Sequence, residues 1–216
     1  MNIRAFIFDM DGLLFDTENL YLRHAKETEQ EIGLSIPADL HIEAIGRTFP
    51  DVKRIFLDRL GSDFPMDYFM QRTKERVYEH VDRYGITIKP GATELLQALK
   101  VRGLMIILAS SSAYWMIEKN LAAAQMNSYF DLIVSGEDVE HGKPAPDIFL
   151  LAAKRAGLQP DECVVLEDSN NGALAGCAAG MRTVMIPDVK PPTPEVEKKV
   201  FRVYPSLSPL LYEEWW

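Results

Sequence analysis

The sequence has few cysteines, no long apolar run and no excess of basic residues. Two of its 216 residues are cysteine, Cys163 and Cys177, which is too few for a disulfide-stabilised scaffold and is typical of the reducing cytoplasm. No apolar run approaches the roughly 20 residues of a membrane span. Acidic residues (32) outnumber basic residues (23), and this net charge of −9 argues against a nucleic-acid-binding surface. We therefore expect a cytoplasmic monomer that binds neither nucleic acid nor membrane.

The composition, with 47% hydrophobic and 25% charged residues, is that of an ordinary globular protein. Several short apolar runs stop abruptly at a polar residue or a proline, and they are too short for helices, so we expect them to be buried strands. These runs are Ile3–Phe8, Leu104–Ala109, Leu132–Val134, Cys163–Leu166 and Thr183–Ile186. Because the runs lack polar alternation, both faces of the sheet should be covered by helices.

The segments between these runs have helical patterns. We expect helices at Ala92–Val101, Ala113–Ala124 and Asp147–Ala156, and a further helix capped by Ser169. Strands and helices alternate from Pro90 onward, which is typical of a parallel, doubly wound, Rossmann-like α/β sheet.

Residues 17–85 break this alternation. They show helical periodicity with turns near Gly33, Pro50 and 61–65, which predicts three helices. We expect a helical insertion at 17–85, with hinges near Asp16–Thr17 and 83–89, inside an α/β core formed by 1–16 and 86–216. His24, His41 and His80 are expected on helix surfaces.

Polar and charged residues follow the predicted strands. Asp9 and Asp11 follow the first, Ser110–Ser112 the second, and Glu167-Asp168 the fourth, with Lys143 in a loop. In an open α/β sheet, ligands bind beyond the carboxyl ends of the strands. At about 4 Å and an effective dielectric constant of about 20, each pair of like charges costs roughly 4 kcal/mol, which a divalent cation would remove. Oxygen ligands favour Mg²⁺ over Zn²⁺, and Mg²⁺ beside a lysine is a good trap for a phosphoryl group.

Each of these motifs also has a purely structural interpretation. The Asp-x-Asp-Gly run at Asp9–Gly12 could be a turn, Ser110–Ser112 and Glu167–Ser169 could cap the following helices, and Lys143-Pro144 could be an exposed loop. The functional interpretation is favoured because every motif follows a strand, in an order that permits convergence.

The sequence resembles phosphatases of the haloacid dehalogenase superfamily, in the β-phosphoglucomutase-like branch. The resemblance covers nearly the whole chain and is carried by four segments in order. These are Phe8-Asp9-Met10-Asp11-Gly12-Leu13-Leu14-Phe15-Asp16-Thr17-Glu18, Leu108-Ala109-Ser110-Ser111-Ser112, Gly142-Lys143-Pro144-Ala145-Pro146-Asp147, and Glu167-Asp168-Ser169-Asn170-Asn171-Gly172 with Ala179-Gly180-Met181. It implies an α/β core, and a helical cap at 17–85 that closes over the site.

The resemblance also implies catalytic roles. Asp9 would be the nucleophile that forms an aspartyl-phosphate, and Asp11 the acid that protonates the leaving oxygen and then the base that activates water. Ser110 and Lys143 would hold the phosphoryl oxygens. The intermediate divides hydrolysis into two displacements at one pocket.

The family pattern further implies bound Mg²⁺, held by Asp9, the backbone carbonyl of Asp11, and Asp168. Glu167 would act from a second layer around the ion. Contacts to a small phosphate ester are expected from Gly12 and Ser111 in the core. In the cap, Arg47, Glu18 and Tyr21 are the candidates, although Arg47 could be an exposed arginine and the other two could simply pack.

Four other functions fit the sequence less well. Dehalogenases of the superfamily lack a second aspartate equivalent to Asp11. Hexose-phosphate mutases of this branch carry a cap histidine where this chain has Tyr21, and a cap arginine where it has Phe49. A receiver-like signalling module would not need the helical insertion, and a catalytically silent binding protein would not need both Asp9 and Asp11. A Mg²⁺-dependent phosphatase is favoured, with a mutase as the alternative.

The resemblance also extends to the substrate class. Phosphatases of sugar phosphates or of nucleoside monophosphates such as pseudouridine phosphate are similar to this chain in the first segment and in Met185-Ile186-Pro187-Asp188.

Overall fold

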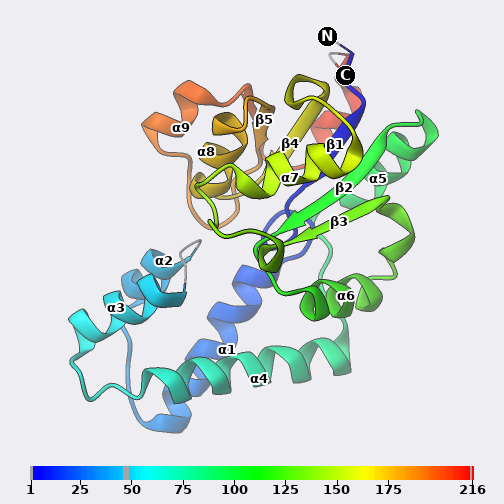
Figure 1. The fold of residues 1–216 in the computed structure, drawn as a ribbon. Coiled ribbons are helices and arrows are strands. Elements are labelled where there is room, and N and C mark those ends of the chain that lie inside the picture. The colour runs from blue at the N-terminus through cyan, green and yellow to red at the C-terminus, as the bar shows by residue number, and fades with distance from the viewer. Residues whose placement is uncertain (1, 46–48, 215) are drawn as a thin grey trace. The chain divides into compact units, whose positions relative to one another are not determined.

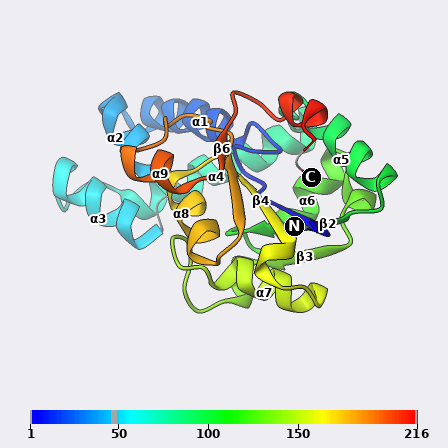
Figure 2. The same ribbon diagram turned by 90° about the horizontal axis from the view of Figure 1, so that it is seen from above.

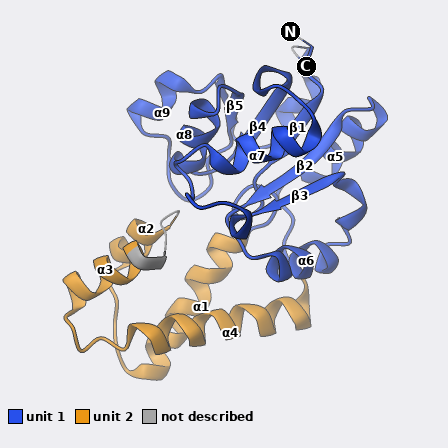
Figure 3. Ribbon diagram, viewed as in Figure 1, with its two compact units in different colours: residues 1–16, 86–216 blue, residues 17–85 orange. Residues whose placement is uncertain are grey.

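The computed structural model describes residues 2–45, 49–214 and 216. The chain divides into two compact units, which Figure 3 colours separately. One consists of Met1–Asp16 and Ile86–Trp216, and the other of Thr17–Gly85. The first unit is an α/β domain and the second consists of helices.

The α/β unit contains a parallel six-stranded sheet (Figure 1). Its strands are β1 (Ala5–Phe8), β2 (Met105–Ser110), β3 (Leu132–Ser135), β4 (Cys163–Glu167), β5 (Arg182–Met185) and β6 (Arg202–Val203). Their order is β3-β2-β1-β4-β5-β6, and every neighbouring pair is parallel. The chain therefore winds outward from β1 in both directions, and this confirms the predicted doubly wound α/β fold.

Alternate side chains of the strands point to opposite faces of the sheet. Phe6 and Phe8 belong to one hydrophobic cluster, while Ala5 and Ile7 belong to another. All four side chains are fully buried. Strand β1 therefore lies at the centre of the molecule's main core, which explains why its sequence shows no polar alternation.

Helices cover both faces of the sheet, as Figure 2 shows for α5 and α7. The helices of this unit are α5 (Ala92–Val101), α6 (Tyr114–Ala123), α7 (Asp147–Ala156), α8 (Asn170–Ala178) and α9 (Pro194–Lys199). Short 3₁₀ turns complete it at η1 (Asn127–Tyr129), η2 (Gly136–Asp138), η3 (Pro160–Glu162) and η4 (Ser208–Tyr212). The bounds of α5 and α7 agree with the prediction. Helix α7 ends at Gly157, which takes a φ of 68°, and Ser169 caps α8 by accepting a hydrogen bond from the N–H of Gly172.

The helical unit contains α1 (Thr17–Ile32), α2 (Ala38–Ala44), α3 (Phe49–Leu60) and α4 (Met66–Tyr84). Its own apolar cluster includes Leu40, Phe56 and Phe69. Helix α2 was not predicted, because seven residues make too short a periodic pattern. The expectation of surface histidines is wrong for His24 and His41, which are buried. His41 Nε2 lies 2.6 Å from Glu29 Oε1, so each polar group compensates the burial of the other.

None of the helices within the described residues is long and apolar enough to cross a membrane. Both cysteines are free thiols, as expected from their number.

Candidate active site

The carboxyl end of β1 places two acidic residues in a tight turn. The N–H of Asp9 still donates to the carbonyl oxygen of Leu166 in β4, at 3.0 Å, and the chain then folds back so that the N–H of Gly12 donates to Phe15 O at 2.9 Å. Gly12 takes a φ of 83°. A Cβ atom at this position would lie 2.3 Å from Oδ2 of Asp168. Glycine is therefore required both by the backbone conformation and by the close approach of a carboxylate.

The carboxyl end of β4 supplies two more acids beside Asp9. Each of Asp9, Glu167 and Asp168 has a carboxylate oxygen within 4.8 Å of the other two. All three side chains are buried, and Glu167 is 1% exposed. The convergence predicted from the strand ends is therefore found at the junction of β1 and β4.

The start of α8 orients Glu167. Its Oε2 accepts hydrogen bonds of 2.9 Å from both the N–H and the hydroxyl of Ser169. The backbone of Gly172 approaches the same carboxylate so closely that a Cβ there would lie 1.7 Å from Oε1. Glu167 is thus fixed by contacts on both oxygens, which limits its freedom to rotate.

Lys143 bridges the acids. Its Nζ donates to Asp9 Oδ1 at 2.5 Å and to Glu167 Oε1 at 2.7 Å, with a longer contact of 3.3 Å to the carbonyl oxygen of Ala109. The lysine side chain is only 8% exposed. Since burial opposes its charge, the two carboxylates are what raise the pKa of Lys143 above its ordinary value.

Burial dominates the electrostatics of Asp9. Desolvation raises its pKa from 3.8 to about 8, the cation of Lys143 opposes this rise, and the charges of Glu167 and Asp11 add to it. Without a further cation, the site therefore holds a proton at neutral pH.

The end of β2 contributes hydroxyl groups. Ser110 is buried, and its Oγ accepts a hydrogen bond of 3.1 Å from the N–H of Ser112. Ser112 Oγ in turn donates to Oδ2 of Asp11 at 2.8 Å. The alternative that this serine run caps α6 is wrong, because the residue that precedes the helix is Ala113 and no side chain caps it. Ser111 is exposed next to this pair.

The donor set fits a divalent cation. When ionised, the three clustered acids carry three negative charges, and Lys143 compensates one of them. Hard carboxylate oxygens without histidine or thiolate are the ligands that Mg²⁺ prefers. The acids are also held in place by glycine contacts and hydrogen bonds, so this part of the chain is preorganised for an ion.

The three residues predicted as cap contacts belong to the segment 17–85. Arg47 lies outside the described residues. Glu18 and Tyr21 lie on α1 of the helical unit and are partly buried. Their contacts to substrate, like those of Gly12 and Ser111, stay predictions.

Sequence reasoning missed Ser112 as the partner of Asp11, and it missed a second ion pair beside the site. Lys89 Nζ lies 2.6 Å from Oδ1 of Asp188, in the loop after β5. Asp188 follows closely after the predicted strand Thr183–Ile186. An acidic residue just after a strand is the signal that could have identified it.

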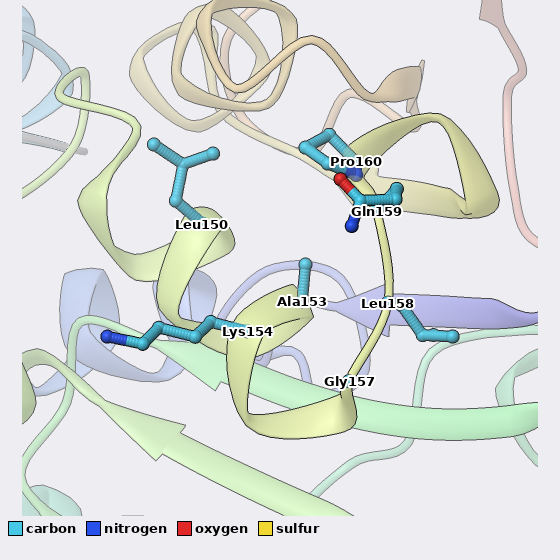
Figure 4. Close-up of a pocket in the computed structure, with 7 residues that line it drawn as sticks. All are labelled: Leu150, Ala153, Lys154, Gly157, Leu158, Gln159 and Pro160. Carbon is cyan, nitrogen blue, oxygen red and sulfur yellow. The ribbon is translucent and has the colours of Figure 1, made fainter.

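A separate pocket of about 450 Å³ lies at the end of α7, and its residues are drawn in Figure 4. It is lined by Leu150, Lys154, Gln159 and Pro160 among others. Because Pro160 precedes β4, this pocket lies at the amino-terminal edge of the sheet and not at the acids.

The chain is similar to known proteins over most of its length. A family model described as "Haloacid dehalogenase-like hydrolase" matches residues 6–186. A Drosophila melanogaster protein named "Probable pseudouridine-5'-phosphatase" is 35% identical over 190 residues, which cover 84% of this chain and 80% of the relative. Hexitol phosphatase B of Escherichia coli (strain K12) is 33% identical over 193 residues, covering 86% and 84%.

Solved structures have the same fold. That of CbbY from Rhodobacter sphaeroides in complex with phosphate superposes with a TM-score of 0.81 at 27% identity, covering 96% of both chains. A Thermotoga maritima structure described as a "putative beta-phosphoglucomutase" superposes with a TM-score of 0.80 at 27% identity, covering 97% of both chains. The comparisons therefore agree with the resemblance inferred from the motifs.

Proposed function

Since the chain belongs to the haloacid dehalogenase-like hydrolase family, we propose that it is a Mg²⁺-dependent phosphatase that hydrolyses small phosphate monoesters through an aspartyl-phosphate. The observation that carries this proposal is the arrangement of Asp9, which is buried between Lys143 and the acids of β4. Burying a carboxylate in this way costs folding free energy, so the position of Asp9 points to a functional role.

The first displacement begins at Asp9. A carboxylate oxygen of Asp9 attacks the phosphorus atom of the ester while the bond from phosphorus to the ester oxygen breaks. Asp11 donates a proton to that departing oxygen, and the alcohol leaves. Lys143 compensates the negative charge of the transferring group, and Ser110 binds its oxygens.

The second displacement regenerates the carboxylate. Asp11, now ionised, takes a proton from a water molecule whose oxygen attacks phosphorus, and the bond from Asp9 to phosphorus breaks. Inorganic phosphate leaves, Asp11 is again protonated, and Asp9 is again a carboxylate. Ser112 supports both roles of Asp11, because its hydroxyl donates to Oδ2 and orients the carboxyl group.

Asp9, Asp168 and the backbone carbonyl of Asp11 would hold Mg²⁺, with Glu167 acting behind them. The ion would neutralise the charge that otherwise repels a phosphate dianion from a carboxylate. Its charge would also favour the ionised form of Asp9, whose pKa burial raises to about 8.

The helical unit, residues 17–85, would act as the cap that selects the substrate. Glu18, Tyr21 and Arg47 are the candidates for contacts to the part of the ester that carries no phosphate. The names of the relatives favour sugar phosphates and nucleoside monophosphates as the substrate class.

A colour assay with p-nitrophenyl phosphate tests the activity. The protein should release p-nitrophenol with Mg²⁺ and stop when EDTA is added, and Asp9→Asn should abolish turnover. Asp161→Asn is the matched control, because this exposed acid lies at the opposite edge of the sheet. Phosphorylation of Asp9 without turnover would instead indicate a receiver.

A panel of phosphorylated metabolites then identifies the substrate class. Release of inorganic phosphate from sugar phosphates or nucleoside monophosphates is the expected result. Conversion of a hexose 1-phosphate to its 6-phosphate without net phosphate release would indicate a mutase. If Arg47→Ala leaves the relative rates across the panel unchanged, its role in specificity is wrong.

A further inference from the structure

The loop after β5 carries a buried carboxylate that the proposed mechanism does not use. The N–H of Ile186 donates to the carbonyl oxygen of Glu167 at 2.7 Å, so the chain beyond β5 continues beside the end of β4. This brings Asp188 next to the acidic cluster. Its side chain is only 7% exposed, and its Oδ1 is occupied by Lys89 Nζ at 2.6 Å.

The second oxygen of this carboxylate is left without a partner. Asp188 Oδ2 is buried, and within the described part of the chain it accepts no hydrogen bond. Buried polar atoms in folded proteins nearly always have a partner, and an exception points to a water molecule or an ion at that place. The position of Lys89 on Oδ1 leaves Oδ2 as the oxygen available to such a group.

Asp188 Oδ2 faces the same point of the chain as the carboxylate of Asp168. A Cβ atom on Gly12 would lie 2.3 Å from Asp168 Oδ2 and 3.3 Å from Asp188 Oδ2. Asp188 does not belong to the compact group formed by Asp9, Glu167 and Asp168, all of whose ligand atoms lie within 4.8 Å of one another. It is therefore placed beside the cation site and not inside it.

We propose that Asp188 is a positioning residue of the metal site, whose Oδ2 accepts a hydrogen bond from a water molecule held by Mg²⁺. The inference rests on the proposed function, because it requires the ion that this function requires. Mg²⁺ usually keeps several of its waters in proteins, and groups that bind those waters tune its affinity. Lys89 orients Asp188 and compensates its charge beside Asp168.

Isothermal titration of the 216-residue chain with MgCl₂ tests this inference. Asp188→Asn is the informative variant. Because Lys89 donates to Oδ1, the carbonyl oxygen of the new asparagine should face Lys89. Its NH₂ group should then replace Oδ2, where it presents a donor in place of an acceptor. We expect the Mg²⁺ dissociation constant to rise by about 10-fold or more, with a melting temperature in EDTA close to that of the wild type. Asp188→Ala should weaken Mg²⁺ binding to a similar extent.

Glu195→Ala is the matched control, since this acid lies in the same segment but is exposed and pairs with Lys199 on the surface. It should leave the dissociation constant unchanged. The inference is overturned if Asp188→Asn binds Mg²⁺ as the wild type does, if Glu195→Ala weakens binding equally, or if neither variant at 188 folds, which would indicate a structural role. A wild-type protein that neither binds Mg²⁺ nor hydrolyses phosphate esters would instead overturn the proposed function.

Discussion

The ammonium group of Lys143 lies 2.5 Å from Oδ1 of Asp9, and both side chains are 8% exposed. The same nitrogen contacts Glu167, which is almost fully buried. A single lysine therefore contacts two buried acids at the carboxyl ends of neighbouring strands. Its loss should affect stability as well as catalysis.

Lys143→Met is expected to lower the free energy of unfolding in EDTA by about 3–5 kcal/mol, because it leaves the buried acids Asp9 and Glu167 without the cation that both of them contact. Hydrolysis of p-nitrophenyl phosphate should fall by about 10²-fold or more, in the range for loss of one charge-stabilising group. Urea denaturation and steady-state kinetics measure the two effects. Lys199→Met, which removes an exposed lysine, should leave both unchanged, and wild-type turnover in Lys143→Met would contradict the role of Lys143.

Asp9→Asn should reveal the cost of burying this carboxylate. Burial raises its pKa from 3.8 to about 8, so the metal-free folded protein holds a proton that the unfolded chain has lost. The contribution of this raised pKa to the free energy of unfolding is fully present below about pH 4 and is lost as the pH rises through about 8. The variant cannot ionise, so its gain in melting temperature over the wild type in EDTA should be larger at about pH 9 than at about pH 5. A gain that is independent of pH would contradict this pKa.

Gly172→Ala is expected to distort the acidic cluster by a steric clash. The added Cβ would lie 1.7 Å from Glu167 Oε1, so the carboxylate or the start of α8 must move. We expect a loss of stability of about 1–3 kcal/mol and weaker Mg²⁺ binding. Gly142→Ala is the control, since a Cβ there meets nothing within 4 Å. Equal behaviour of the two variants would show that the approach of Gly172 to Glu167 has no consequence.

Ser112→Ala tests the support of Asp11. Without the hydroxyl that donates to Asp11 Oδ2 at 2.8 Å, the carboxyl group is less well oriented for proton transfer. We expect kcat to fall by about 10-fold with little change in KM, and Ser112→Thr, which keeps a hydroxyl, to retain most of the activity. If alanine and threonine at 112 give the same rate, the hydrogen bond is not functional.

The strands, helices and site were predictable to different degrees. The bounds of α5 and α7 agree with the prediction because local signals decide them, such as Gly157 after α7. Strand β6 was not predicted, because Arg202–Val203 has no apolar pattern and forms a strand only by pairing with β5. Helix α9 (Pro194–Lys199) was likewise not among the predicted helices.

The order of the motifs along the chain was enough to predict which acids meet. Asp9, Glu167 and Asp168 each lie at the carboxyl end of a strand, and parallel strands present these ends at one edge of a sheet. The contacts of Ser112 and Asp188 were not predictable in this way. They depend on how a loop bends after its strand, and side chains far apart in the sequence leave no periodic signal of such a contact.

The sequence by itself determined the fold class and the meeting of Asp9, Glu167 and Asp168 at one edge of the sheet, because short apolar runs that end in carboxylates leave few arrangements in which those charges are tolerable. Only the tertiary structure decided which groups are buried and what they contact. It placed Lys143 between two carboxylates, buried His41 against Glu29, and brought Asp188 beside Asp168. Burial and desolvation depend on packing from distant parts of the chain, and local sequence does not encode them.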